Sequence, residues 1–221
     1  MRRTTALAHG RRGALAKVFI AVPTTPFGGI HPECFKSIYG LDPAGNILLF
    51  DYTSGYDCAQ ARNRIARQSI DEDFDYVLMV DSDTVLPRDT IRMMLDEPVD
   101  VLAACCPHRP ASNVYDGRIN ATKLGERDYT DFYTATDLAD LRERGVTREL
   151  IHGCGFGATM VRVDVFRNMS WPWFSWTDYP DGNCLSEDLS FCERCHDHGI
   201  TVHLDPRITC GHVMRKTEWA V

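Results

Sequence analysis

The stretch Asp75–Asp83 (DYVLMVDSD) decides the fold of this chain. Its apolar run YVLMV indicates a strand that is buried on both faces, as in a parallel sheet covered by helices. Ligands of such sheets bind outside the carboxyl ends of the strands, where Asp81-Ser82-Asp83 follows. Two carboxylates one residue apart in a turn can face one hard cation such as Mg²⁺ or Mn²⁺. Aspartate and serine are also common in turns that bind nothing.

Outward from this stretch, apolar strands alternate with helical segments. Before it we predict a strand at 17–25, a short helix at 31–41, a strand at 46–52 and a helix capped by Asp57. After it we predict a helix that begins at Pro87 and strands at 99–106, 150–163 and 201–205. A further helix, before the last of these strands, is capped by Ser186-Glu187-Asp188 and ends at Gly199. This alternation is typical of an α/β fold, with a mainly parallel central sheet and helices on both faces.

Length and composition allow one well-filled domain. The chain has 221 residues, 44% of them hydrophobic and 25% charged, which suffices for one large core and is short for two complete domains. We expect this domain to span residues 17–221. Residues 1–16 carry four arginines without the apolar segment of an export signal, so we expect a flexible basic arm there.

Composition also limits the classes of function. No apolar run approaches the ~20 residues that cross a bilayer. The net charge of −7 argues against a protein that binds nucleic acid mainly through phosphates, although the basic arm leaves a local contact open. Nine cysteines without the spacing of a disulfide scaffold favour the cytoplasm. Cys192 and Cys195 form a single CxxC pair, which we interpret as buried thiols in preference to a zinc site.

Several motifs together resemble those of GT-A glycosyltransferases, most closely the family-two-like bacterial and phage members. These motifs are VPTT (22–25), ARNRIA (61–66), YVLMVDSD (76–83), HGCGFGATMVR (152–162), SEDLSFCERC (186–195) and a late GH (211–212). The resemblance runs from Lys17 to His212, and within it residues 108–148 match no known motif. It implies a GT-A (Rossmann-like) three-layer sandwich, with 17–107 as the nucleotide-binding half and 108–221 as the acceptor-binding half.

The resemblance further implies a metal-dependent glycosyltransferase of the EC 2.4 class, which moves a sugar from a nucleotide-sugar, most simply a UDP-sugar, to an acceptor hydroxyl. Asp83, His212 and Asp81 would hold the metal, with Asp81 acting directly or through ribose and water. The metal neutralises charge on the leaving nucleoside diphosphate. Because an imidazole ligand suits Mn²⁺ better than Mg²⁺, we favour manganese.

The donor would lie along the ends of the first three strands. By the resemblance, the loop after the first strand receives the base, an acid after the second contacts base or ribose, and the following helix faces the same crevice. A guanidinium there could reach the base or a diphosphate oxygen. The residues expected to bind the donor are Pro23, Thr24, Thr25, Asp51, Arg62, Asn63, Asp81 and Ser82.

The acidic pair Glu187-Asp188 matches the family position of the catalytic base. In an inverting enzyme this carboxylate removes the proton of the acceptor hydroxyl, and we favour Asp188 for that role. Acids in the first turn of a helix also complement its dipole without any chemistry. Gly153, Trp173 and Trp176 are candidates to frame the acceptor, which is a glycan or a hydroxylated base in phage DNA; the tryptophans could equally belong to the core.

Two other functions use similar residues. A nucleotidyltransferase would carry a glycine-rich loop with a lysine after the first strand, whereas residues 23–33 (PTTPFGGIHPE) contain no lysine. A non-catalytic nucleotide- or sugar-binding module would be expected to lack Asp81, Asp83 or Asp188, and all three are present.

Overall fold

The computed structural model describes residues 15–108, 116–125 and 129–213. In this part of the chain, one continuous sheet has the strand order β2-β1-β3-β9-β5-β12-β8-β6-β7. Its strands are β1 (Lys17–Thr24), β2 (Ile47–Ser54), β3 (Tyr76–Val80), β5 (Val101–Cys105), β6 (Arg118–Lys123), β7 (Phe132–Thr134), β8 (Glu149–Cys154), β9 (Ala158–Arg162) and β12 (Val202–Thr209). Two short pairs stand apart from it: β4 (Thr84–Val85) with β13 (Gly211–His212), and β10 (Thr177–Asp178) with β11 (Cys184–Leu185).

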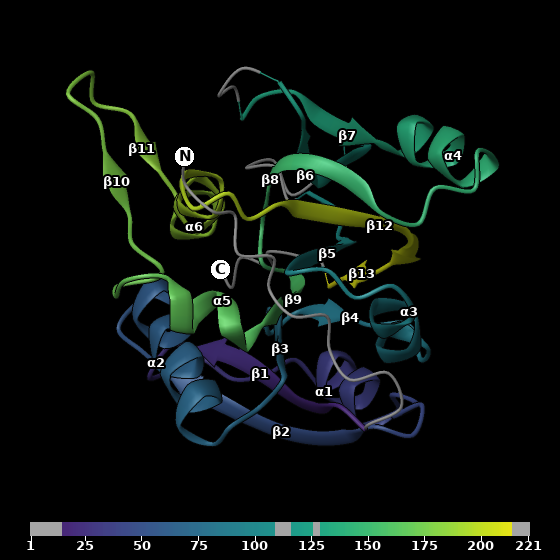
Figure 1. The fold of residues 1–221 in the computed structure, drawn as a ribbon, viewed down its shortest axis with the longest axis vertical. Helices are drawn as coiled ribbons and strands as arrows, with labels where there is room; N and C mark the ends of the chain where they lie inside the picture. The colour runs from purple at the N-terminus through teal and green to yellow at the C-terminus, as the bar shows by residue number, and fades with distance from the viewer. Residues whose placement is uncertain (1–14, 109–115, 126–128, 214–221) are drawn as a thin grey trace, which may run out of the picture.

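Helices cover both faces of the sheet (Figure 1). They are α1 (Pro32–Tyr39), α2 (Cys58–Asp71), α3 (Thr90–Asp96), α4 (Ala135–Glu143), α5 (Val163–Asn168) and α6 (Glu187–Asp197). Strands β2, β1, β3, β5 and β12 run in one direction, and β9 runs against them between β3 and β5. The predicted α/β sandwich is confirmed. None of the helices in the described part is long and apolar enough to span a membrane.

Strand β1 shows why the sheet needs helices on both sides. Its apolar side chains alternate between two cores, as a period of two residues requires. Val18, Ile20 and Val22 pack with residues of α1 and α3, whereas Phe19 and Ala21 pack with residues of α2 and α6. Both faces of β1 are therefore buried, and the chain becomes exposed at Thr25, directly after the carboxyl end of the strand.

The second helix follows its predicted start. The Asp57 carboxylate accepts a hydrogen bond from the Gln60 N–H at 2.7 Å, which satisfies one of the otherwise unpaired amides of the first turn. The buried face of α2 includes Ala61, Arg62 and Ile65. A charged side chain thus points into the same interface as the apolar ones.

Two predicted elements differ from the structure. Helix α3 begins at Thr90 and not at Pro87, because Pro87 closes a turn by accepting the Thr90 N–H at 3.2 Å. The single strand predicted at 150–163 is two strands, β8 and β9, separated by a turn. At Gly155 in this turn, a Cβ atom would lie 1.7 Å from Nδ2 of Asn120, so only glycine fits.

The region after residue 107 contains two strands that its sequence does not indicate, in addition to the helical segment that the sequence predicts around residues 137–144. Strands β6 and β7 extend the sheet beyond β8, and α4 begins with a capping box between Thr134 and Asp137. The predicted N-terminal arm lies outside the described residues, except for Leu15 and Ala16. All nine cysteines are described and none forms a disulfide; Cys192 and Cys195 are buried in α6.

A buried ion cluster fastens β12 to α3. The fully buried carboxylate of Asp205 accepts hydrogen bonds from Arg148 at 2.6 Å and from Arg207 at 2.7 and 2.9 Å. Both arginines also bind Asp96 at the end of α3. This cluster holds the strand that leads to Gly211 and His212.

We expect Asp205→Ala to destabilise the fold by about 3 kcal/mol, because it removes the fully buried carboxylate that Arg148 and Arg207 share and leaves the largely buried Arg148 with the partly exposed Asp96. Equilibrium urea unfolding would measure the loss. Arg92→Ala is the control: its ion pair with Asp89 is exposed, so the change should cost less than about 1 kcal/mol. A loss for Asp205→Ala as small as that of the control would contradict this role.

Candidate active site

The turn Asp81-Ser82-Asp83 lies at the carboxyl end of β3, beside the end of β1 and the start of β9. The Asp81 N–H donates to the carbonyl of Gly157 at 2.9 Å, and its own carbonyl accepts the Thr84 N–H at 3.0 Å. The carbonyl of Ser82 accepts the His31 N–H at 2.8 Å. These bonds fix the backbone of the turn at the end of the strand.

The structure brings His212 to this turn. Strand β13 pairs antiparallel with β4, directly after Asp83, with His212 opposite Thr84. Nε2 of His212 lies 3.4 Å from Oδ1 of Asp83. Nδ1 lies 3.1 Å from the carbonyl oxygen of Pro107. Two predicted metal ligands that are far apart in the sequence therefore lie side by side.

The bond to Pro107 determines what His212 presents to Asp83. A carbonyl oxygen only accepts hydrogen bonds, so Nδ1 must carry a proton. In a neutral imidazole, Nε2 then offers a lone pair to a carboxylate, an arrangement that a shared cation would satisfy. A carboxylate with an imidazole suits Mn²⁺. No three His, Cys, Asp or Glu side chains in the described residues are gathered into a ready-made metal site, so donor oxygens and water would have to complete it.

Asp81 is held differently from Asp83. Its Oδ1 accepts a hydrogen bond from Nη2 of Arg62 at 2.8 Å, while 39% of its side-chain surface stays accessible. The pKa of Asp81 is raised because surrounding protein atoms exclude water from the carboxylate. Arg62 opposes this shift, and the nearby charges of Asp188 and Asp83 add to it.

Arg62 is almost fully buried, with 3% of its side chain exposed. Its second terminal nitrogen, Nη1, forms a short hydrogen bond with Glu187 at the start of α6. The guanidinium carbon lies 5.5 Å from the centre of the Phe156 ring. Burial alone would lower the pKa of Arg62, but Asp81 and Glu187 raise it, so the group is charged. Each Nη atom thus donates one N–H to a carboxylate of the protein, and the role of Arg62 toward a donor stays a prediction.

Glu187 and Asp188 are adjacent but lie in different surroundings. Glu187 is 5% exposed, and burial raises its pKa above the ordinary value of 4.5 although Arg62 acts in the opposite direction. Asp188 is half-buried, and its Oδ1 accepts hydrogen bonds from the Ser186 hydroxyl and from the Leu189 N–H. The sequence predicted that Ser186 caps the helix. In the structure its side chain makes no cap hydrogen bond and holds the Asp188 carboxylate instead.

The other predicted donor residues differ in exposure and in their hydrogen-bond partners. Pro23 and Thr24 are buried, Thr25 is exposed, and the Thr24 hydroxyl is 2.9 Å from that of Ser54. Asp51 is half-buried and accepts the Tyr52 N–H; it lies within the edge strand β2, opposite Ala21 of β1, and not at the strand end as predicted, because β2 continues to Ser54. The amide of Asn63 is fully used: it donates to the carbonyls of Ala59 and Phe174 and accepts from the N–H groups of Trp173 and Phe174.

Of the acceptor candidates, only Trp176 lies at the surface, with 51% of its area exposed. Trp173 belongs to the core, where its indole N–H donates to the carbonyls of Phe166 and Met169. Gly153 is buried, and a Cβ atom there would lie 2.9 Å from the Tyr129 ring. We therefore leave Trp173 and Gly153 out of the acceptor surface.

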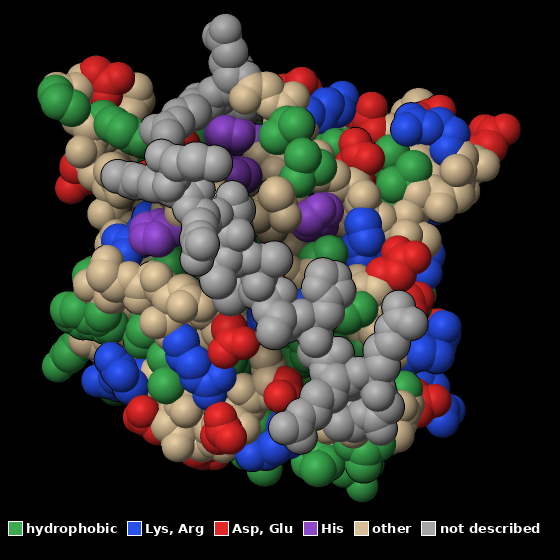
Figure 2. Space-filling model, viewed as in Figure 1, with side chains coloured by type: hydrophobic (Ala, Val, Ile, Leu, Met, Phe, Trp, Pro, Cys, Tyr) green, Lys and Arg blue, Asp and Glu red, His purple; other side chains and the backbone are tan. Residues whose placement is uncertain are grey.

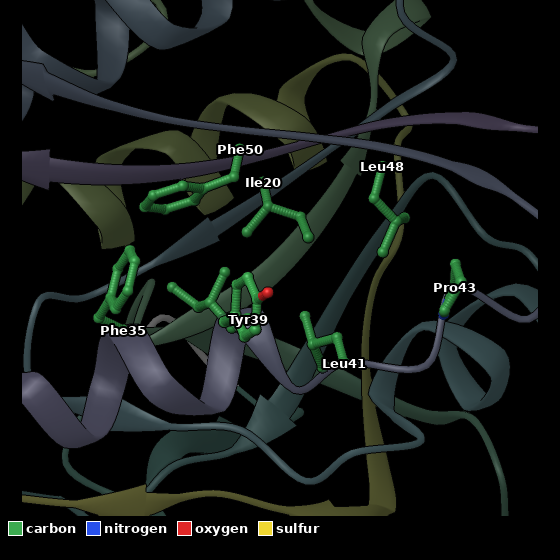
Figure 3. Close-up of a pocket in the computed structure, with 8 residues that line it drawn as sticks. Ile20, Phe35, Tyr39, Leu41, Pro43, Leu48 and Phe50 are labelled. Atoms are coloured by element: carbon green, nitrogen blue, oxygen red, sulfur yellow. The ribbon is translucent and has the colours of Figure 1, made fainter.

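An apolar cavity of about 420 Å³ lies between α1 and β2 (Figure 3). Phe35 and Phe50 lie together at one side of it in an edge-to-face contact, with ring centres 5.9 Å apart. The full lining is Ile20, Phe35, Ile38, Tyr39, Leu41, Pro43, Leu48 and Phe50. Since no carboxylate, histidine or basic side chain lines it, this cavity offers no metal ligand and no phosphate contact.

The comparisons with known proteins agree with this architecture. No protein-family model and no curated protein matches the sequence. The solved structure of A197 from STIV matches with a TM-score of 0.59 at 14% identity, over 90% of this chain and 86% of that chain. The glycosyltransferase GalNAc-T7, solved with UDP, GalNAc and Mn²⁺, matches with a TM-score of 0.60 at 10% identity.

The fold is GT-A-like. The match to GalNAc-T7 covers 92% of this chain and 44% of that chain, so this chain spans less than half of that protein. At such low identity the likeness shows the fold alone. Within a GT-A-like fold, the observed turn Asp81–Asp83 follows a central strand of the sheet.

The buried state of Glu187 predicts a dependence of stability on pH. Because the folded pKa is raised, the protonated form stabilises the fold below pH 4.5, and this contribution is lost as the pH rises through the folded pKa. The amide introduced by Glu187→Gln does not titrate. The melting temperature of the variant relative to wild type should therefore increase between about pH 4 and about pH 8. Exposed Glu143→Gln is the control and should show no such trend; a flat difference for Glu187→Gln would disprove the shift.

Proposed function

We propose that this protein is a metal-dependent glycosyltransferase that moves a sugar from a nucleotide-sugar to an acceptor hydroxyl. The observation that carries the proposal is the contact between Asp83 and His212 at the carboxyl edge of a GT-A-like sheet, with Asp188 at the start of the neighbouring helix. The likeness to GalNAc-T7, a structure that contains UDP and Mn²⁺, favours a UDP-sugar donor.

The metal would be Mn²⁺, held by Asp83 and by Nε2 of His212. When bound, it supplies positive charge next to the diphosphate that leaves the sugar. Pro107 orients His212 through Nδ1, which is the kind of second contact that fixes a metal-binding imidazole. Asp81, bound to Arg62, would act through ribose or water and not as a direct ligand.

Asp188 is the proposed general base of an inverting transfer. Ser186 and Leu189 both bind its Oδ1, which fixes the side chain. Among the described residues no hydrogen bond is made to Oδ2, so this oxygen can accept the proton of an acceptor hydroxyl. Glu187 is bound to a buried guanidinium and is 5% exposed, which makes it the weaker candidate for that proton.

The nucleoside would lie over the ends of β1 and β2. Thr25 is exposed at the end of β1, and Asp51 lies in β2, its parallel neighbour. The buried Pro23 and Thr24 would form the floor of this region, and the half-buried Ser82 would lie between it and the metal. Asn63 is proposed to act through the segment Trp173–Phe174 that it binds.

The surroundings of Asp188 favour an uncharged acceptor. Between Arg167 and Arg194 the sequence contains no lysine or arginine, while Trp171, Trp176 and Tyr179 are exposed. Exposed aromatic rings can stack on a sugar ring, and Arg194, the cation that ends this stretch, is bound to the carbonyl of Ser170. On the face shown in Figure 2, basic and acidic side chains are interspersed and form no basic stripe. We therefore propose a glycan acceptor in preference to DNA, and the cytoplasm as the compartment in which nine free thiols persist.

The proposal predicts that UDP raises the melting temperature of the wild-type protein only when Mn²⁺ is present. A ligand at about 100 times its Kd stabilises the folded state by about 2.7 kcal/mol, which a thermal-shift assay resolves. GDP, TDP and CDP in the same assay would define the base. Asp83→Ala should abolish the shift, whereas the exposed Asp89→Ala should keep it. A UDP shift independent of Mn²⁺ and of Asp83 would contradict the metal assignment.

Asp188→Asn should retain the Mn²⁺-dependent UDP shift and lose turnover by about 10²–10⁴-fold, because asparagine keeps the shape of aspartate but cannot take a proton. Initial rates of UDP release from a UDP-sugar, with a glycan acceptor present, would measure this. Asp178→Asn, on the exposed hairpin, is the matched control. Turnover close to that of wild type in Asp188→Asn would rule out Asp188 as the base.

A further inference from the structure

Arg62 connects the two sides of the candidate site. Its Nη2 donates to Asp81 at the end of β3, and its Nη1 donates to Glu187 at the start of α6. These two positions are far apart in the sequence, and the Arg62 fork is the hydrogen-bonded link between them. The planar guanidinium holds both partners in one geometry, which a lysine could not do.

The rest of the Arg62 side chain is also enclosed by protein. Its third nitrogen, Nε, is buried and has no hydrogen-bond partner among the described residues. The guanidinium packs over Phe156. One N–H of each Nη donates to a carboxylate and Nε is buried, and only 3% of the side chain is exposed, so little of Arg62 is accessible to a donor.

The ion pairs are a costly way to stabilise a fold. A buried ion pair is often no more stabilising than apolar residues of the same size, so its benefit lies in fixing a particular arrangement. The carboxylates of Asp81, Glu187 and Asp188 all act on the charge of Arg62. The arrangement that Arg62 fixes is the position of the α6 start, and hence of Asp188, relative to the turn that carries Asp83.

We propose that Arg62 is a positioning residue, which sets Asp188 at the correct place opposite the metal-bound donor and does not itself bind the donor. This inference rests on the proposed function. It assigns Asp81 and Glu187 to the two arms of Arg62, and leaves Asp83 with His212 for the metal and Asp188 for the acceptor proton.

The test compares Arg62→Met with the double variant Arg62→Met/Glu187→Met. The single variant leaves Glu187 buried without its partner, so its melting temperature should fall. The double variant replaces the pair by apolar side chains of similar length and should regain most of that loss. It should keep the Mn²⁺-dependent UDP shift, yet release UDP from a UDP-sugar about 100-fold more slowly, with KM for the donor changed by less than about threefold.

If Arg62 only stabilised the fold, the melting temperature and the rate of UDP release would change together. Arg62→Lys should recover part of the melting temperature without recovering the rate, because an ammonium group cannot hold two carboxylates in the same way. Amide hydrogen exchange of residues 187–191 gives a readout independent of turnover: it should increase in the double variant although its melting temperature is retained. Exposed Arg92→Met is the control and should change none of these quantities.

The outcomes are distinguishable. Turnover and hydrogen exchange like those of wild type in the double variant would overturn the positioning role. A folded double variant that no longer responds to Mn²⁺ and UDP would show that Arg62 binds the donor, which also overturns it. If the wild-type protein itself gives no Mn²⁺-dependent shift with any nucleoside diphosphate, the proposed function fails, and this inference fails with it.

Discussion

The antiparallel insertion of β9 between β3 and β5 is the constraint on which the candidate site depends. Its residues pair with Tyr76–Val80 on one side and with Val101–Ala103 on the other, so a late segment of the chain completes a sheet begun by early ones. The turn before β9 supplies Gly157, whose carbonyl binds the Asp81 N–H, and Phe156, on which Arg62 packs. Without β9, neither the aspartate turn nor the arginine would have its support.

Charge is distributed unevenly around this centre. Asp81, Asp83, Glu187 and Asp188 lie close enough for Asp188 and Asp83 to raise the pKa of Asp81, and one buried arginine opposes them. A purely structural ion pair would need only one carboxylate for the one arginine, whereas four carboxylates are present here. The excess of carboxylates is the physical reason to expect a cation in the working protein, and the contact of His212 with Asp83 indicates where we propose that it binds.

The sequence predicted those elements whose signals are local. The uninterrupted apolar run of β3 and the Asp57 cap of α2 are contained in a few residues each, and both were confirmed. The break between β8 and β9 was missed because alternating apolar residues look alike on both sides of the turn at Gly155, whose requirement comes from Asn120 in another strand. The hairpin of β10 and β11 was also missed, since two-residue strands have no detectable period.

The site was predictable in its composition but not in its contacts. The resemblance named Asp83 and His212, and the structure places them 3.4 Å apart; their role as metal ligands stays a prediction. It also named Arg62 as a donor contact, whereas the structure binds both arms of that side chain to carboxylates from distant segments. Such long-range partners leave no trace in spacing or periodicity. Ser186, which holds Asp188, had been interpreted only as a helix cap.

Anomalous diffraction at the manganese edge, from crystals grown with Mn²⁺ and UDP, would test the metal site directly. We expect one strong peak bound by Oδ1 of Asp83 and Nε2 of His212, next to the UDP diphosphate, with Arg62 still bridging Asp81 and Glu187. A peak elsewhere, or ordered UDP at the strand ends without manganese between it and Asp83, would contradict a metal-dependent transferase.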